Sequence, residues 1–219
     1  MALYIDSAYL PDIIEVARTV PVVGVTTNPT LLLQAQERGQ DLKPEQLLNE
    51  LLHAIGGTIF MQPGAATEEE MYEQALAYMQ TAPGRVLPKI PMTPVGMRVA
   101  KKLHQHALAF TAVTSVAQAY SAAVLEAHFI IPYYNRLERL GVDAGKRLAE
   151  MAEVLSKQEL PTRILAASIK SPGEAVSALL SGAHDITAAP GILLEMVSDP
   201  QTDAAVEKFT QDWQKVNTQ

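Results

Sequence analysis

Short apolar runs alternate along the chain with longer segments in which apolar residues recur every three or four positions. The short runs are rich in β-branched residues and each predicts a strand, whereas the longer segments predict amphipathic helices. Eight strands are expected, at residues 3–5, 22–25, 58–61, 85–90, 107–113, 128–131, 163–168 and 184–187.

Several of the predicted helices have recognisable starts, in which a hydroxyl side chain precedes a glutamate or a proline. Examples are Thr67–Glu70, Thr93–Pro94 and Ser171–Glu174. Eight strand–helix alternations predict an α/β fold of the (β/α)8 TIM-barrel type, with an open doubly wound sheet as the alternative. No linker or low-complexity tract divides residues 1–219, so we expect a single barrel domain.

Residues 200–219 follow the eighth unit and predict one additional C-terminal helix. Val206, Phe209, Trp213 and Val216 have the spacing that places them on one face of it. A closed barrel does not require this helix. Its apolar face is therefore expected to pack either beneath its own barrel or on a neighbouring subunit.

Composition favours a globular protein and argues against a nucleic-acid-binding, secreted or membrane-spanning one. A chain of 219 residues that is 48% hydrophobic can bury a sizeable core, and a net charge of -7 without a basic stripe argues against nucleic acid as a partner. The chain has no cysteine, and its first residues lack the basic start and long apolar run of a signal peptide. We therefore expect a cytoplasmic protein, and no apolar run is long enough to suggest a membrane span.

The candidate chemistry lies where the predicted strands end, because the active site of a (β/α)8 barrel is built at the carboxyl ends of its strands. Taken alone, each polar residue there has a structural alternative, such as capping a helix or satisfying a backbone group. The polar residues that close the apolar runs are Asp6, Thr27, Asn28, Gln62, Lys89, Thr111, Tyr133, Ser168 and Lys170.

Lys89 is unusual because its neighbours from Val86 to Met92 are all apolar. Removing an ammonium group from water lowers its pKa and yields a neutral amine that can attack a carbonyl. A buried ion pair would explain the same position. The residues alone leave both interpretations open.

Other chemistries find less support in the sequence. The five histidines have no metal-ligand spacing, so no metal is expected. Residues 141–148 resemble the end of a phosphate-binding P-loop, but the glycine spacing is wrong and Arg147 replaces the magnesium-binding hydroxyl. Neither a dinucleotide-binding fingerprint nor a serine nucleophile elbow is present, and no cofactor is expected.

Six short motifs, taken in order, resemble the transaldolase family, and more closely its short branch, the fructose 6-phosphate aldolases. The resemblance covers almost the whole chain, and the ordered set is far more specific than any one motif. The motifs are YIDSA (4–8), GVTTNPT (24–30), PKIPMT (88–93), TAVTSVAQA (111–119), PYYNR (132–136) and AASIKSP (166–172).

The resemblance implies a metal-free class I aldolase or transaldolase, in which Lys89 forms a Schiff base with a ketose phosphate such as fructose 6-phosphate. Asp6 and Asn28 would hold hydroxyl groups of the bound triose. Tyr133 would donate and accept protons. Thr27 would face the substrate, and Gln62 and Thr111 would position a water molecule.

The resemblance also implies how the substrate phosphate and the subunits are held. Arg136, Ser168 and Lys170 would bind the phosphate group. The short branch forms rings of subunits, so a homo-oligomer is implied, specifically a decamer of two stacked pentamers, with residues 200–219 in the contacts.

Three positions depart from the family pattern. Thr114 replaces a usual aromatic residue, so the pocket is expected to be wider or more polar there. Pro63 follows Gln62 and could shift its amide, and the loop after Arg136 lacks the double glycine common in the aldolase branch. These departures affect the expected substrate more than the expected lysine chemistry.

Three functions are compatible with the sequence: a fructose 6-phosphate aldolase, a transaldolase, and a catalytically silent barrel that binds a sugar phosphate or serves a regulatory partner. The transaldolase branch usually has a glutamate and a phenylalanine where this chain has Gln62 and Tyr133, which favours simple aldol cleavage. The silent barrel is disfavoured because Lys89, Asp6 and Asn28 are all present.

Overall fold

Eight parallel strands close into a barrel in the computed structural model, which describes residues 1–217. Each strand pairs with the next along the chain, and β8 pairs with β1. All eight predicted strands are present, and closure rules out the open doubly wound sheet. The strands are β1 (Leu3–Asp6), β2 (Val22–Thr26), β3 (Thr58–Met61), β4 (Val86–Pro91), β5 (Ala109–Val113), β6 (Phe129–Pro132), β7 (Arg163–Ile169) and β8 (Asp185–Ala188).

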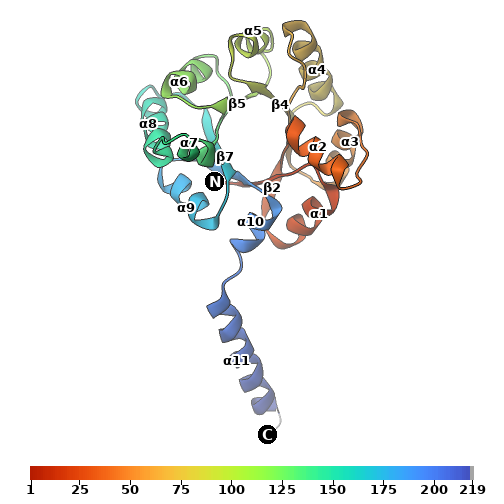
Figure 1. Ribbon diagram of the computed structural model, residues 1–219, viewed down its shortest axis with the longest axis vertical. Coiled ribbons are helices and arrows are strands. Elements are labelled where there is room, and N and C mark those ends of the chain that lie inside the picture. The colour runs from red at the N-terminus through yellow and green to blue at the C-terminus, as the bar shows by residue number, and fades with distance from the viewer. Residues whose placement is uncertain (218–219) are drawn as a thin grey trace.

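A ring of helices surrounds the barrel, as Figure 1 shows. Residues 200–217 form a separate helix beyond this ring. Within the described residues the helices are α1 (Leu10–Thr19), α2 (Pro29–Glu37), α3 (Pro44–Ala54), α4 (Glu68–Thr81), α5 (Pro94–Lys102), α6 (Val116–Val124), α7 (Tyr134–Arg139), α8 (Ala144–Lys157), α9 (Pro172–Leu180), α10 (Pro190–Glu195) and α11 (Pro200–Asn217).

The predicted helix starts are confirmed by their hydrogen bonds. Thr67, Thr93 and Ser171 are N-caps whose side-chain oxygens accept from the backbone N–H three residues on. Each cap satisfies one of the backbone donors that the first turn of a helix leaves unpaired. These caps fix where α4, α5 and α9 begin, and α5 and α9 start within three residues of the strand before them.

The barrel interior is filled by aromatic and aliphatic side chains below the strand ends. The ring of Phe60 packs edge-on against Tyr4, at a centroid distance of 5.5 Å, and against Phe129, at 5.2 Å. Tyr4 lies two residues before Asp6 on β1 and therefore points to the same side of the strand. The aromatic layer thus forms a packed floor beneath the polar residues at the carboxyl ends.

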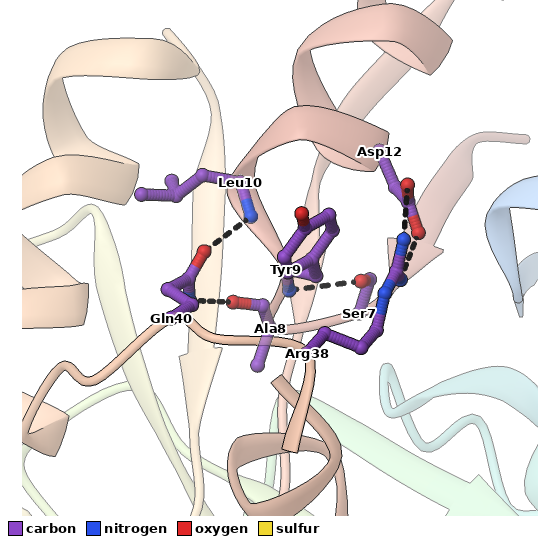
Figure 2. Close-up of polar contacts among 7 residues, drawn as sticks. All are labelled: Ser7, Ala8, Tyr9, Leu10, Asp12, Arg38 and Gln40. Atoms are coloured by element: carbon purple, nitrogen blue, oxygen red, sulfur yellow. Dashed lines mark hydrogen bonds and ion pairs between the residues drawn. The ribbon is translucent and has the colours of Figure 1, made fainter. Parts of the chain in front are cut away.

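The loop after β1 is held by a side chain from beyond α2. The Gln40 side chain accepts a hydrogen bond from Leu10 N at 2.8 Å and donates one to Ala8 O at 2.6 Å (Figure 2). The same side chain thus binds one backbone N–H and one backbone carbonyl of the loop, which restricts its movement. This contact helps to fix the backbone that follows Asp6.

A second contact holds the same loop from its other side. Arg38 forms a two-point ion pair with Asp12, and its guanidinium lies 3.6 Å from the centre of the Tyr9 ring (Figure 2). Planar, paired hydrogen bonds of this kind fix orientation as well as charge. The start of α1 is therefore locked onto the end of α2.

Helix α11 extends away from the barrel in Figure 1 and buries none of its residues. Val206, Phe209, Trp213 and Val216 are between 54% and 67% exposed. The expectation that this helix packs beneath its own barrel is therefore wrong for the single chain, and the apolar face remains uncovered. No helix within residues 1–217 combines the length and the apolar character needed to cross a bilayer.

Candidate active site

A cavity of about 470 Å³ opens at the carboxyl ends of the strands. It brings together residues from β1, β3, β4, β5 and β7 and from the starts of α2 and α7. Nine of the ten residues that the sequence nominated line it, namely Asp6, Asn28, Gln62, Lys89, Thr111, Tyr133, Arg136, Ser168 and Lys170.

Thr27 is the exception, and the expectation that it faces the cavity is corrected by the structure. Its side chain is fully buried and its hydroxyl donates to the backbone carbonyl of Phe60 at 3.0 Å. Adjacent residues of an extended segment point to opposite sides, so Thr26 and Thr27 cannot both face the barrel interior. Thr27 instead ties the end of β2 to β3.

Lys89 carries the unusual chemistry of the cavity. The residue is only 2% exposed, and burial lowers the pKa of its amine from 10.5 to about 8, although the charge of Asp6 acts in the opposite direction. Among the residues that the structure describes, none forms a hydrogen bond or an ion pair with its side chain. The buried ion pair that the sequence left open is therefore not formed, and the amine lines the cavity with about a tenth of it neutral at pH 7 and about half at pH 8.

Asn28 lies at the start of α2, where it both caps the helix and lines the cavity. Its side-chain oxygen accepts from Leu31 N at 3.0 Å and so caps the helix, while the residue also lines the cavity. Asp6 does not cap α1, because Tyr9 occupies the N-cap position and Leu10 N, in the first turn, donates to the side chain of Gln40 instead. The Asp6 carboxylate is thus available to the cavity.

Three polar groups at the ends of β3, β5 and β6 are suited to transfer protons and to hold a water molecule. The hydroxyls of Thr111 and Tyr133 are 3.0 Å apart, and either can donate to the other. The side-chain oxygen of Gln62 is buried and is the acceptor of no hydrogen bond from residues 1–217. A buried amide oxygen without a donor is costly, so a donor within the cavity, such as water or a substrate hydroxyl, fits this position.

The ends of β5 and β7 share a backbone distortion. The pairing register shifts between Thr111 and Val113 and again between Ala166 and Ile169. Within these two segments Ala112 has a φ of 58° and Ser168 a φ of 60°, in the left-handed region that L side chains rarely adopt. Each such residue costs about 1–3 kcal/mol, and both line the cavity, so the strain is concentrated where side chains are aimed at a ligand.

The cavity is locally cationic within an acidic protein. Lys89, Arg136 and Lys170 line it, against the single carboxylate of Asp6. Arg136 lies 4.6 Å from the centre of the Tyr133 ring, and within residues 1–217 neither Arg136 nor Lys170 forms an ion pair. Two cations that carboxylates leave free suit an anionic ligand group.

Glu174 ties together the two segments that carry these cations. One of its carboxylate oxygens accepts from the side-chain amide of Asn135 at 2.8 Å, beside Arg136, and the other accepts from Lys170 N at 2.9 Å. The loop after β7 is therefore braced against α7. Sequence reasoning missed this residue because it is a helix-start glutamate with no mark of a further role.

Two of the three departures from the family pattern, Thr114 and Pro63, lie outside the cavity lining. Thr114 lies outside the cavity lining, and its hydroxyl donates to Gln118 at 3.1 Å, so its own side chain adds no polar group to the cavity. Pro63 is buried next to Gln62, which still reaches the cavity. The sequence also failed to nominate several lining residues, because they are helical or apolar: Pro29, Thr30, Leu31, Gln34, Pro91, Ala112 and Ala167.

No three histidine, aspartate or glutamate side chains within residues 1–217 lie close enough together to hold a metal ion. The chemistry that this site offers from its own side chains is therefore a buried amine, a carboxylate, a hydroxyl pair and a cationic rim.

Comparisons with known proteins identify one matching family and several solved structures with a similar barrel fold. The model of the Transaldolase/Fructose-6-phosphate aldolase family matches residues 3–219. Among solved structures, a mandelate oxidase variant is 13% identical over 87% of this chain, with a TM-score of 0.58, and a flavocytochrome b2 variant with sulfite bound is 11% identical over 88%, with a TM-score of 0.63. This chain spans 66% and 58% of those two chains. At such identities the likeness shows the barrel fold alone.

The pKa of Lys89 predicts how its reactivity depends on pH. With dihydroxyacetone and cyanoborohydride, reductive labelling of Lys89 should rise roughly tenfold per pH unit below about pH 8 and level off above it, because only the neutral amine forms an imine. The measurement is the initial labelling rate of the Lys89 peptide by mass spectrometry.

Lys102 is the internal control, because its pKa is raised by a hydrogen bond to Glu68, so its labelling should keep rising where that of Lys89 has levelled. Labelling of Lys89 that also rises without a plateau up to pH 10 would show that its amine is not perturbed.

Proposed function

The chain belongs to the transaldolase/fructose-6-phosphate aldolase family, a family of enzymes that act on sugar phosphates, and from this premise we propose that it is a class I aldolase. The proposed reaction cleaves fructose 6-phosphate to dihydroxyacetone and glyceraldehyde 3-phosphate, and forms it in reverse. The observation that carries the proposal is the buried, unpartnered amine of Lys89 with its lowered pKa at the base of a cationic cavity.

Lys89 begins the proposed reaction as a nucleophile. Its neutral amine attacks C2 of the open-chain ketose, and loss of water leaves an iminium ion. The C3–C4 bond then breaks and its electron pair moves into the iminium. The proton of the C4 hydroxyl passes to Tyr133 in its phenolate form, glyceraldehyde 3-phosphate leaves, and an enamine of dihydroxyacetone remains on Lys89.

Tyr133 and its neighbours complete the turnover. The phenol returns its proton to C3 of the enamine, and a water molecule hydrolyses the resulting iminium to release dihydroxyacetone. The hydroxyl of Thr111, 3.0 Å from that of Tyr133, and the unpaired oxygen of Gln62 are the groups that would hold this water. Asp6 and Asn28 would bind hydroxyl groups of the triose.

The substrate phosphate would bind at the cationic rim. Arg136 and Lys170 supply charge, and Ser168 supplies a hydroxyl from its strained position at the end of β7. The end of strand seven is also where many (β/α)8 barrels bind phosphate. This assignment leaves Asp6 and Asn28 for the unphosphorylated end of the sugar.

Replacing Tyr133 tests the proton transfer. Tyr133→Phe should lower cleavage of fructose 6-phosphate by roughly 10²-fold or more, the scale for loss of a general acid–base group. Dihydroxyacetone release is the measurement, and Tyr120→Phe, which removes a phenol from the outer surface of α6, is the matched control. Full cleavage by Tyr133→Phe would make the tyrosine structural.

Replacing Gln62 tests the choice between cleavage and transfer. A glutamate can act as a base and adds a negative charge beside the iminium, whereas the amide of Gln62 does neither. Gln62→Glu should therefore raise transfer to an aldose phosphate acceptor relative to hydrolysis. Free dihydroxyacetone and transferred product are measured together, and wild-type protein that yields only transferred product would make the enzyme a transaldolase.

The uncovered face of α11 supports a homo-oligomer, proposed as two stacked pentamers. Docking on a neighbouring subunit would remove Phe209 and Trp213 from water. Light scattering should therefore show an oligomer for the full chain and smaller species for a chain truncated after Pro200.

The matched control is Thr210→Ala, on the same helix but without a large apolar side chain, which should leave the oligomer intact. A monomeric full chain, or an oligomer unaffected by the truncation, would contradict the assignment.

A further inference from the structure

Two threonines that do not line the cavity form a hydrogen-bonded line to Asp6. The Thr26 hydroxyl donates to a carboxylate oxygen of Asp6 at 2.8 Å, and the oxygens of the Thr26 and Thr187 hydroxyls are 2.6 Å apart. Thr26 comes from β2 and Thr187 from β8, the two strands that flank β1 in the closed barrel. The line therefore crosses the strand that carries Asp6 and exists because the barrel is closed.

Both threonines are shut off from solvent. Thr26 is 0% exposed and Thr187 is 1% exposed. Threonine in a strand is a common β-branched residue, so nothing in the sequence sets these two apart from ordinary strand positions. Their significance comes from what their hydroxyls reach.

The direction of the hydrogen bonds follows from the number of protons. A threonine hydroxyl has one proton to donate, and Thr26 gives its proton to Asp6. The short contact between the two hydroxyls must then be a donation from Thr187 to Thr26. Hydrogen bonds arranged head to tail polarise one another, so the Thr187 hydroxyl strengthens the bond that ends on the carboxylate.

Asp6 depends on this line for its orientation. Within residues 1–217, Thr26 is the only residue whose side chain hydrogen-bonds the Asp6 carboxylate. One carboxylate oxygen is thereby fixed toward β2, which leaves the other for the cavity that Asp6 lines. Without the line, the carboxylate could rotate about its side-chain bonds.

The geometry points to Thr187 as a positioning residue for the reaction, acting through Thr26 to hold Asp6 in the orientation that binds the triose hydroxyl. This inference rests on the proposed function, because it gives Asp6 a substrate to bind. Neither threonine touches the substrate. Their contribution is to keep the Asp6 oxygen in place before the substrate arrives, so that binding energy is not spent on ordering it.

The test is a double-mutant cycle between Thr187 and Asp6. Thr187→Val keeps the side-chain shape and removes the hydroxyl, and it should lower kcat/KM for fructose 6-phosphate by about tenfold, the upper end of the scale for a hydrogen bond between two neutral groups. In an Asp6→Asn background the same substitution should have less than a twofold effect, because its route to the substrate is already cut.

Two further variants separate positioning from stability. Thr187→Ser, which keeps the hydroxyl, should retain most of the activity. Thr162→Val removes another buried threonine hydroxyl, which donates to Ala127 O at 2.6 Å before β7 begins, and should lower the melting temperature without changing kcat/KM. If Thr187→Val does not fold, Thr187→Ala removes the same hydroxyl without adding a methyl group against Thr26.

The outcomes distinguish the inference from the function on which it rests. An equal loss from Thr187→Val in the wild-type and Asp6→Asn backgrounds would overturn the positioning role alone. Serine failing to restore activity in a folded protein would do the same. A wild-type protein that cleaves no ketose phosphate would overturn the proposed function, and the positioning role with it.

Discussion

The chemistry of the site depends on one unfavourable feature of the fold: the amine of Lys89 is buried inside a closed barrel. A pKa that falls from 10.5 to about 8 means that the ammonium form is about 3 kcal/mol less favourable there than in water. Below pH 8 the folded chain carries this cost, and the cost disappears as the pH rises toward 10.5, because the unfolded chain then also loses its proton. The rest of the barrel must supply the stability that Lys89 removes.

Closure of the barrel makes this burial possible and gives the amine its surroundings. Packed aromatic rings of Tyr4, Phe60 and Phe129 exclude water from below, and the strand ends place polar groups above. The line from Thr187 through Thr26 to Asp6 crosses from β8 to β1 and β2, so it too requires that the sheet close on itself. The geometry of the site therefore depends on closure of the barrel as much as the fold does.

The sequence predicted most of the fold and most of the cavity, for one physical reason. In a parallel barrel the carboxyl ends of all strands face one way, so polar residues that close apolar runs meet at one opening. Asp6, Gln62 and Lys89 were found in this way and line the cavity. The helix caps were equally visible, because Thr93 and Ser171 satisfy a local rule that needs no tertiary contact.

What the sequence could not predict depends on direction and on contacts between distant strands. Thr27 was misplaced because neighbouring residues of an extended segment point to opposite sides, and a motif does not say which side is the interior. The left-handed backbone of Ala112 has no local signal, since alanine ordinarily avoids it. Thr187 is 161 residues from the threonine it contacts, and only the folded chain brings them together.

The central claim is that a single buried amine performs the chemistry, and the most direct measurement compares the wild type with Lys89→Met. Methionine is of similar length and apolar, so it fills the same space without an amine. The account predicts that the wild type releases dihydroxyacetone from fructose 6-phosphate at pH 8, and that Lys89→Met releases none above the buffer while melting at no lower a temperature. Cleavage by Lys89→Met at a rate near that of the wild type would contradict the account.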